Sequence, residues 1–262
     1  RVGLSPLSIL ERGFRGEVLR QKLGLFVVTS KTSKPLALLA PDNPTLGVMP
    51  PYTPLHHLLL AECGFPLIAT SGNRADEPIC TDEHEALIRL RGIADLFLVH
   101  NRPIPRPIDD SVVRVMAGRM MMIRRARGYA PKPLSIRRGM IYHAPTNLSG
   151  YNDAILAVGA HLKNAVAIRR GDDIFISQHI GDLSTAGAHH HFEQTISDLS
   201  AMLDVHPQKV ICDAHPDYAS TTYAHQTGLP IRKIQHHYAH ALACLAENGV
   251  ELPALAVVWD GT

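Results

Sequence analysis

The chain has 262 residues, 45% of them apolar, and a formal net charge of +2. That length exceeds what one hydrophobic core ordinarily organises, so we expect two domains, and the small net charge does not favour a nucleic-acid-binding protein. No apolar run approaches the roughly 20 residues that cross a bilayer, so we expect no membrane segment. The four cysteines are scattered without a C-x-x-C pair, which argues against a disulfide framework or a zinc ribbon and favours a cytoplasmic protein.

Up to about residue 130, short apolar runs alternate with segments of helical pattern. Strands are predicted at "LFVVT", "FPLIAT", "DLFLV" and "SVVRVMAG", and helices at "PLHHLLLAEC" and "DEHEALIRL". Such alternation favours an α/β or mixed α+β domain. The following stretch, "GYAPKPLSIRRGMIYHAPTNLSGYN", is rich in Pro, Gly and Asn and has no sustained period, so it is interpreted as the connection between two domains.

The second half begins with "AILAVGAHLKN" and continues into "AVAIRRGDDIFISQHIG", where "RRGDD" predicts the turn of a hairpin. A helix is expected from about 189 to 204, then a strand at "KVICDAH", a helix near 217–227, a strand at "IRKIQ" and a last, histidine-rich helix. Three strands, a helix, a strand, a helix and a strand form the order of an actin-like or RNase-H-like half domain.

The last helix begins with "QHHYAH", in which His236 and His240 have the i, i+4 spacing that places two side chains on one face. Asp260, predicted at the end of an apolar strand, could complete a two-histidine, one-carboxylate metal site of the kind that suits iron or zinc. The alternatives are a solvated helix start and an ordinary turn aspartate. The consecutive histidines 189–191 point about 100° apart on a helix, so we interpret them as a solvated helix start.

Two further groups of residues could bind phosphate. Gly159 permits a tight turn after a strand, and Lys163 can add positive charge, although a plain hairpin turn explains the same residues. Small polar side chains at Thr70, Ser71 and Asn73 follow a predicted strand and could hydrogen-bond a nucleotide.

Arginine side chains near strand ends, such as Arg124 in "MMMIRRARGY", offer planar forks for phosphate or carboxylate. Ser111, in "PRPIDDSVVRV", adds a hydroxyl close to one of these strands. The alternative for this region is a solvated edge strand protected by charge.

Taken in order, these segments resemble one family. "LLAPDNPTLGVMPPYTPLHHLLL", "ATSGNRADEPI", "DDSVVR", "RRARGYAP", "AVGAHLKN", "SQHIGDL", "DAHPDYAST" and "QHHYAHALACLAENG" are similar to the HypF carbamoyltransferases that mature nickel–iron hydrogenases. The resemblance implies a YrdC/Sua5-like twisted-sheet domain followed by part of an actin-like ATPase (Kae1-like, RNase-H-like) domain. It places an N-terminally incomplete YrdC-like domain at 1–130, a connecting segment at 131–152 and a C-terminally truncated Kae1-like domain at 153–262.

The resemblance also implies an activity. Carbamate from carbamoyl phosphate would react with ATP, in the presence of Mg²⁺, to give carbamoyl-adenylate, and the carbamoyl group would pass to the C-terminal cysteine of a HypE-like acceptor protein. No nucleic acid or membrane partner is implied. By position in the family motifs, the residues assigned to the adenylate pocket are Thr70, Ser71, Asn73, Ser111 and Arg124. Those assigned to the first phosphate loop of the Kae1-like domain are Gly159, Lys163 and Asn164, and those assigned to the metal and to catalysis are His236, His240 and Asp260.

Two other interpretations stay open at this point: an antibiotic-type O-carbamoyltransferase, which shares both domains, and a catalytically inactive fragment or binding module. The unbroken apolar run "ALAVVW" predicts a strand buried on both faces. If part of the Kae1-like domain is missing, this strand and the histidine helix should expose apolar surface.

Overall fold

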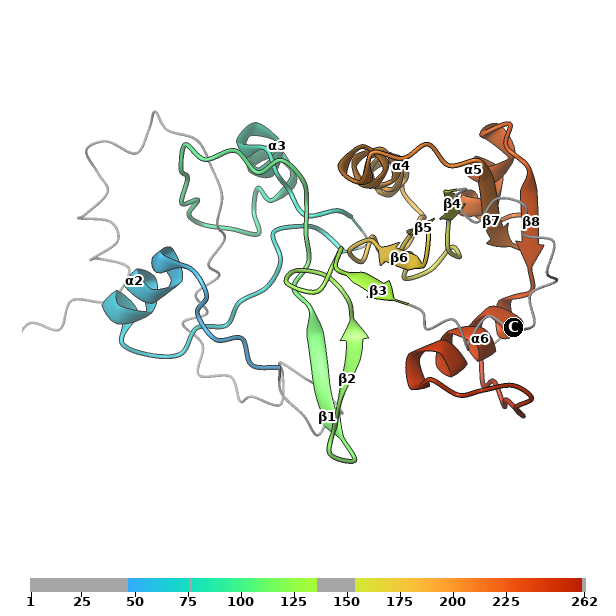
Figure 1. Ribbon diagram of the computed structural model, residues 1–262. Coiled ribbons are helices and arrows are strands. Elements are labelled where there is room, and N and C mark those ends of the chain that lie inside the picture. The colour runs from blue at the N-terminus through green and yellow to red at the C-terminus, as the bar shows by residue number, and fades with distance from the viewer. Residues whose placement is uncertain (1–46, 76, 136–153, 261–262) are drawn as a thin grey trace, which may run out of the picture. The chain divides into compact units, whose positions relative to one another are not determined.

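The computed structural model describes residues 47–75, 77–135 and 154–260 (Figure 1). The chain divides into two compact units. The first comprises the described residues up to Asn73 together with Cys80–Pro107, and the second comprises Arg74–Ile79 and the described residues from Ile108 onward. No helix in the described ranges has the length and apolar character needed to cross a membrane.

The first unit contains two helices, and both were predicted. Helix α2 spans Pro54–Cys63, and helix α3 spans Glu83–Arg89. The Thr53 hydroxyl accepts a hydrogen bond from a backbone N–H in the first turn of α2, and Gly64 ends that helix in the left-handed conformation. The Asp82 carboxylate caps α3 in the same way by accepting two backbone N–H bonds.

The strands predicted at 65–70 and 95–99 are wrong: these residues form no regular strand. A strand needs a neighbour to pair its backbone N–H and C=O groups, and no described strand pairs with either segment. The segment "LFVVT" lies outside the described residues.

The second unit begins with an antiparallel hairpin and continues into a six-stranded sheet. The hairpin strands are β1 (Val112–Met116) and β2 (Arg119–Arg124). The strands of the sheet are β3 (Pro133–Ser135), β4 (Ile155–Ala157), β5 (Ala167–Arg170), β6 (Asp173–Ile176), β7 (Lys209–Asp213) and β8 (Ile231–Ile234). They lie in the order β3-β6-β5-β4-β7-β8; β4 pairs with β7 and β7 with β8 in parallel, and the remaining pairs are antiparallel.

Three helices complete this unit: α4 (Ala186–Leu203), α5 (Ala219–Gln226) and α6 (His236–Asn248). The run β4-β5-β6-α4-β7-α5-β8 has the element order predicted for an RNase-H-like half domain, which is confirmed. The hairpin turn at Gly171, with φ +62°, is also confirmed. Strand β3 lies in the segment predicted to connect two domains, and it pairs with β6.

The core of the second unit lies between the sheet and its helices. Alternate residues of the strands face this core, and α4 contributes side chains three and four positions apart, as an amphipathic helix does. The central members of the core are Leu156, Val166, Ile168, Val210, Phe192, Ile196, Leu199 and Leu203. Because the strands are anchored by this core, the carboxyl ends of β7 and β8 are held side by side, with Asp213 in register with Ile234.

Two predictions about this unit need correction. Residues 254–259 form no strand, so the prediction of a strand there is wrong. The physical reason is the same as in the first unit, because no described strand pairs with this segment. The predicted exposure of apolar surface is confirmed, because Leu255 and Trp259 are 96% and 97% exposed. His191 is 8% exposed and faces the core, whereas His189 and His190 are exposed as predicted.

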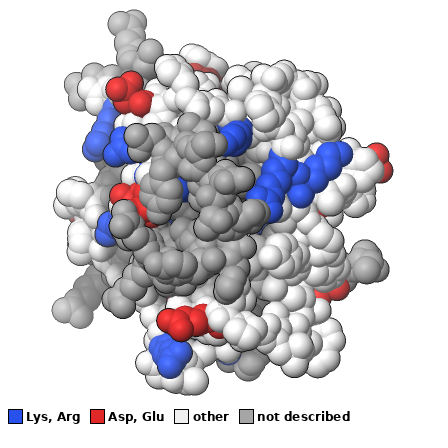
Figure 2. All heavy atoms as spheres, turned by 45° about the vertical axis from the view of Figure 1, so that its right-hand side comes forward, with Lys and Arg blue, Asp and Glu red and all other residues white. Residues whose placement is uncertain are grey.

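Figure 2 shows one face of the structure, on which side chains of both charges, Lys and Arg as well as Asp and Glu, occur among the described residues.

Candidate metal site and nucleotide-binding segments

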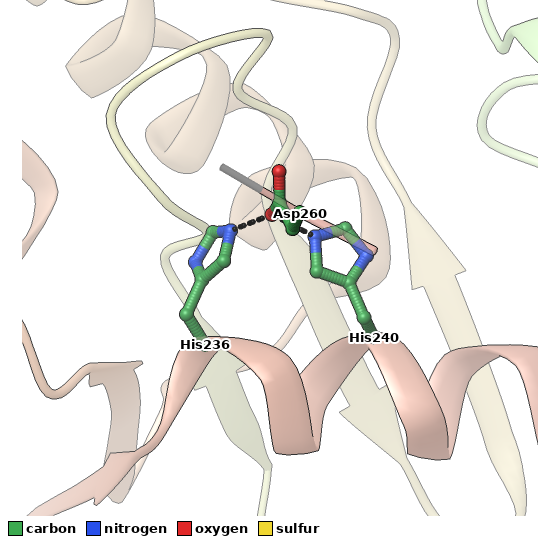
Figure 3. A group of neighbouring side chains, drawn as sticks. All are labelled: His236, His240 and Asp260. Atoms are coloured by element: carbon green, nitrogen blue, oxygen red, sulfur yellow. Dashed lines mark ion pairs between the residues drawn. The ribbon is translucent and has the colours of Figure 1, made fainter. Parts of the chain in front are cut away.

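His236, His240 and Asp260 meet in the structure (Figure 3). Asp260 Oδ2 lies 2.9 Å from His236 Nε2 and 3.0 Å from His240 Nε2. The ligand atoms that the three residues offer all lie within 4.8 Å of one another. In Figure 3 both imidazole rings rise from the same side of α6 toward the carboxylate. The predicted residues are therefore brought together by the fold.

The local sequence explains why α6 presents this pair. Gln235 caps the helix, because its side-chain oxygen accepts a hydrogen bond of 2.7 Å from the Tyr238 N–H. Starting the helix at His236 places His240 one turn later on the same face, with the two ring centroids 4.9 Å apart. His237 points elsewhere and lies 2.8 Å from the Gln235 amide through its Nδ1.

A second carboxylate flanks the site, and no sequence motif had pointed to it. Asp213, the last residue of β7, places Oδ2 2.6 Å from His236 Nδ1. The hydrogen bond to Asp213, and then the charges of Asp213 and Asp260, raise the pKa of His236 despite partial desolvation. The sequence held one signal for this residue. Asp213 ends β7, and the neighbouring strand, β8, leads into α6.

His240 and His236 lower the pKa of Asp260. Desolvation acts to raise the pKa of this carboxyl, but the charges and hydrogen bonds of His240 and His236 outweigh it and lower the pKa below its usual value. One oxygen of the Asp260 carboxylate therefore links the two imidazole rings at the start of α6.

The donor set fits a transition-metal ion. Two imidazole nitrogens and one carboxylate oxygen are the ligands that iron and zinc accept, with open positions left for a substrate. Ligand atoms held at about 2.1 Å from one ion lie about 3 Å apart when they subtend a right angle. The separations of 2.9 and 3.0 Å from the Asp260 oxygen are of that size. An ion bound here would replace the Nε2 protons, so binding would release protons.

The predicted phosphate loop is a tight turn braced from within. Gly159 has φ +68°, and a Cβ at this position would lie 2.5 Å from a backbone oxygen, so only glycine fits. Asn164 is 1% exposed, and its amide donates to the carbonyl oxygens of Val158 at 2.9 Å and Ala160 at 2.6 Å. Asn164 therefore holds the loop in shape through its amide hydrogens, and its buried Oδ1 has no hydrogen-bond partner among the described residues. Lys163 is exposed and has φ +48°.

The residues assigned to the adenylate pocket lie in two groups, and each group belongs to a different unit. In the first unit, Thr70 and Ser71 are exposed, and the Asn73 N–H donates to the Ser71 carbonyl at 3.1 Å, which forms a turn around the buried Gly72.

In the second unit, Ser111 closes the base of the β1–β2 hairpin. Its hydroxyl donates to the Arg127 carbonyl and accepts from the Ala126 N–H, each at 2.9 Å. The Arg124 guanidinium lies 3.8 Å from the Asp109 carboxylate. This serine therefore positions the segment that follows β2, while Arg124 keeps 41% of its side chain exposed.

Comparison with known proteins identifies the two halves of the chain. Residues 151–247 match the HypF Kae1-like domain, and residues 21–126 match the Sua5–YciO–YrdC family, which bears the description telomere recombination. The chain thus joins a YrdC-like domain to a Kae1-like domain of the HypF type.

Relatives over most of the chain are carbamoyltransferases of one name. Carbamoyltransferase HypF of Synechocystis sp. is 50% identical over 225 residues, which cover 86% of this chain and 28% of that protein. Carbamoyltransferase HypF of Rhizobium leguminosarum bv. viciae is 38% identical over 244 residues, covering 90% of this chain and 31% of that protein. The chain belongs to the HypF family, and it spans about a third or less of the length of these relatives.

Solved structures agree with this assignment. The crystal structure of full-length HypF in the phosphate- and nucleotide-bound form superimposes with a TM-score of 0.70 at 44% identity, covering 78% of this chain and 26% of that one. HypF of T. kodakarensis superimposes with a TM-score of 0.68 at 31% identity, covering 76% of this chain and 25% of that one.

Proposed function

We propose that this chain provides the adenylate-forming and carbamoyl-transferring parts of a carbamoyltransferase that acts in nickel–iron hydrogenase maturation. The observation that carries the proposal is the convergence of two histidines and an aspartate within the Kae1-like half of a HypF-family chain. The curated relatives are named carbamoyltransferase HypF, which supports the same reaction class.

In the YrdC-like half, a carbamate oxygen attacks the α-phosphorus of ATP, and pyrophosphate leaves. The product is carbamoyl-adenylate, a mixed anhydride in which AMP is a good leaving group. The hydroxyl and amide groups of Thr70, Ser71 and Asn73 would orient the nucleotide. Arg124 would stabilise the negative charge that develops on the phosphate, and Ser111 would hold the backbone that presents this arginine.

In the Kae1-like half, the loop that contains Gly159, Lys163 and Asn164 would bind the phosphates of ATP with Mg²⁺. Gly159 would let the backbone approach the phosphate closely, Asn164 would keep the loop in shape, and the exposed Lys163 would add positive charge. A related HypF crystallised in a phosphate- and nucleotide-bound form, which supports nucleotide binding by this family.

His236, His240 and Asp260 would hold an iron or zinc ion. When bound, such an ion would supply Lewis-acid chemistry that polarises the reacting carbonyl. The acceptor cysteine thiolate of a HypE-like protein would attack that carbonyl carbon, and AMP would leave as the thiocarbamate forms. Exclusion of water from the reaction would prevent hydrolysis of the anhydride.

We further propose the domain division 1–130, 131–152 and 153–262 and a cytoplasmic location. The matched ranges 21–126 and 151–247 support the division. The four cysteines are scattered in the sequence without a C-x-x-C pair, which is compatible with a reducing compartment.

The test of the proposed reaction is ATP–pyrophosphate exchange by this chain with ammonium carbamate as the carbamoyl source. We expect exchange that depends on carbamate and is lost in Arg124→Ala. Absence of carbamate-dependent exchange in a folded chain that still binds ATP would contradict the proposal and favour a binding module.

A further inference from the structure

We propose that Asp213 is a positioning residue for the metal site, which fixes the ring orientation and the tautomer of His236. The inference deepens the proposed function, and it rests on that function for the presence of a metal. Asp213 lies outside the three residues that could share one ion. It acts through His236 rather than on the ion.

A neutral His236 imidazole has one N–H, and two carboxylates compete to accept it, Asp213 at Nδ1 and Asp260 at Nε2. Asp213 Oδ2 lies 2.6 Å from His236 Nδ1, and a carboxylate can only accept, so this hydrogen bond needs the hydrogen on Nδ1. The Asp213 side chain is 8% exposed, whereas that of Asp260 is 37% exposed. Because a hydrogen bond is stronger where water is excluded, the neutral imidazole keeps its hydrogen on Nδ1. The Nε2 lone pair is then directed at the ligand cluster.

Asp213 is itself held rigidly, which a positioning residue requires. Its Oδ1 accepts the His215 N–H at 2.8 Å, and its backbone carbonyl accepts the Thr221 hydroxyl at 3.3 Å. It pairs with Ile234 across the parallel strands β7 and β8, and the chain continues from Ile234 through one residue to His236. Sheet register therefore sets the distance between the carboxylate and the imidazole.

The loop after Asp213 adds a second support. His215 stacks on Tyr218 with ring centroids 4.2 Å apart and an interplanar angle of 8°. Tyr218 in turn stacks on His161 of the proposed phosphate loop, with centroids 5.7 Å apart. Stacked rings therefore connect the loop that binds the Asp213 carboxylate to the proposed phosphate loop.

The two histidine ligands are not equivalent. His236 is held between Asp213 and Asp260, and its side chain is 32% exposed. His240 is 53% exposed, and among the described carboxylates only Asp260 lies within ion-pair distance of it. We infer that His236 is the preset ligand and that His240 adjusts when an ion binds.

The experiment uses two readouts on the full 262-residue chain, with Asp213→Ala, Asp213→Asn and the matched control Asp217→Ala. Asp217 lies in the same loop and is exposed. The first readout is the long-range ¹H–¹⁵N spectrum of His236 without metal, recorded at alkaline pH where the imidazole is neutral and assigned by comparison with His236→Gln. The second is the dissociation constant for Co²⁺, from visible absorbance.

We expect the Nδ1–H form of His236 in the unsubstituted chain and in Asp217→Ala, and a shift toward the Nε2–H form in Asp213→Ala. Co²⁺ affinity should fall about 10- to 100-fold in Asp213→Ala, the usual effect of removing a partner of a metal-bound histidine. Asp213→Asn keeps an acceptor oxygen, so it should retain the Nδ1–H form and lose less affinity.

Three results would overturn the inference: an unchanged His236 spectrum in a folded Asp213→Ala chain, unchanged Co²⁺ affinity in that variant, or an equal loss in Asp217→Ala. If Asp213→Ala does not fold by circular dichroism, Asp213→Asn decides, since an Nε2–H form of His236 in that chain would contradict the proposal. Failure of the unsubstituted chain to bind Co²⁺ would contradict the proposed metal site, while the spectrum still decides the role of Asp213.

Discussion

The backbone N–H of His179 donates to the carbonyl oxygen of Arg125 at 2.9 Å, which ties the segment after β2 to the segment after β6. The Arg125 guanidinium strengthens this junction by donating to the carbonyls of Tyr129 at 2.9 Å and Lys132 at 2.8 Å. The side chains of His179 and Arg125 are both partly buried, and burial lowers the pKa of each. The junction therefore contains a histidine that is disfavoured as a cation in the folded state.

The first prediction is a pH dependence of stability at His179. Burial lowers the pKa of His179. The negative charges of Asp109 and Asp182 oppose this effect, and the positive charges of Arg124 and Lys163 reinforce it. A histidine in the unfolded chain has a pKa near 6.5. Between the lowered pKa of the folded state and that value, the unfolded state therefore binds more protons than the folded state. The free energy of unfolding should therefore fall as the pH decreases below about 6.5 through the folded pKa.

His179→Gln should remove this part of the acid sensitivity. The measurement is the urea midpoint of the chain and of the variant at pH 7.5 and pH 5.5, and the difference between the two proteins should grow in favour of the variant at the lower pH. An equal change in both proteins would mean that His179 contributes nothing. The comparison matters because the raised pKa of His236 gives a contribution of opposite sign, which both proteins share.

The second prediction concerns the metal ligands. His236→Ala and His240→Ala should each remove stoichiometric metal, because either change leaves two protein ligands. Elemental analysis after loading with Zn²⁺ and gel filtration measures this directly. The control is His190→Ala, an exposed histidine on α4, which should retain the metal. Metal content in His240→Ala equal to that of the control would contradict the assignment.

The third prediction concerns Arg124. Arg124→Ala should lower carbamate-dependent pyrophosphate exchange by roughly a hundredfold, the scale of losing one donor that stabilises developing charge. Arg119→Ala removes an exposed arginine from the other end of the same strand and should leave exchange unchanged. Co²⁺ affinity should be the same in both variants, since neither arginine contacts the histidine cluster. Loss of metal binding together with exchange would show that Arg124 supports the fold rather than the reaction.

The fourth prediction uses two glycines that share a backbone conformation but differ in surroundings. Gly159 has φ +68° and Gly171 has φ +62°. A Cβ added at Gly159 would lie 2.5 Å from a backbone oxygen, whereas a Cβ added at Gly171 would have no atom within 4 Å. Gly171→Ala should cost about 1 kcal/mol, from the left-handed backbone alone. Gly159→Ala should cost more than that, because backbone must also move. Thermal or urea unfolding measures both, and equal costs would mean that the loop is not tightly packed.

Sequence patterns correctly predicted helices with a periodic apolar face and a hairpin whose turn residue is a glycine. Helices α4 and α6 have periodic apolar faces and capping residues, and the β5–β6 hairpin has a glycine at the turn. The strands predicted at 65–70 and 254–259 are wrong, because an apolar run does not show which segment pairs with it.

For the candidate site, the i, i+4 spacing of His236 and His240 was enough to indicate a shared helix face. The position of Asp213 depends instead on the register of β7 against β8. That register brings Asp213 next to His236, which lies 23 positions later in the sequence. Asn164 was assigned to the phosphate loop by resemblance. The structure adds a contact that the sequence does not reveal, because its amide hydrogens bond two carbonyls of that loop.

Strand β3 has a consequence for self-association. An unpaired outer strand presents backbone donors and acceptors to any passing strand of another molecule. Among the described residues, β3 covers β6 at one border of the sheet and so occupies the edge of β6 that a second copy could otherwise pair with. At the opposite border, β8 carries Arg232 and Lys233, whose like charges would repel the same strand of another copy. Edge-to-edge addition to the described sheet is therefore opposed at β6 by coverage and at β8 by charge.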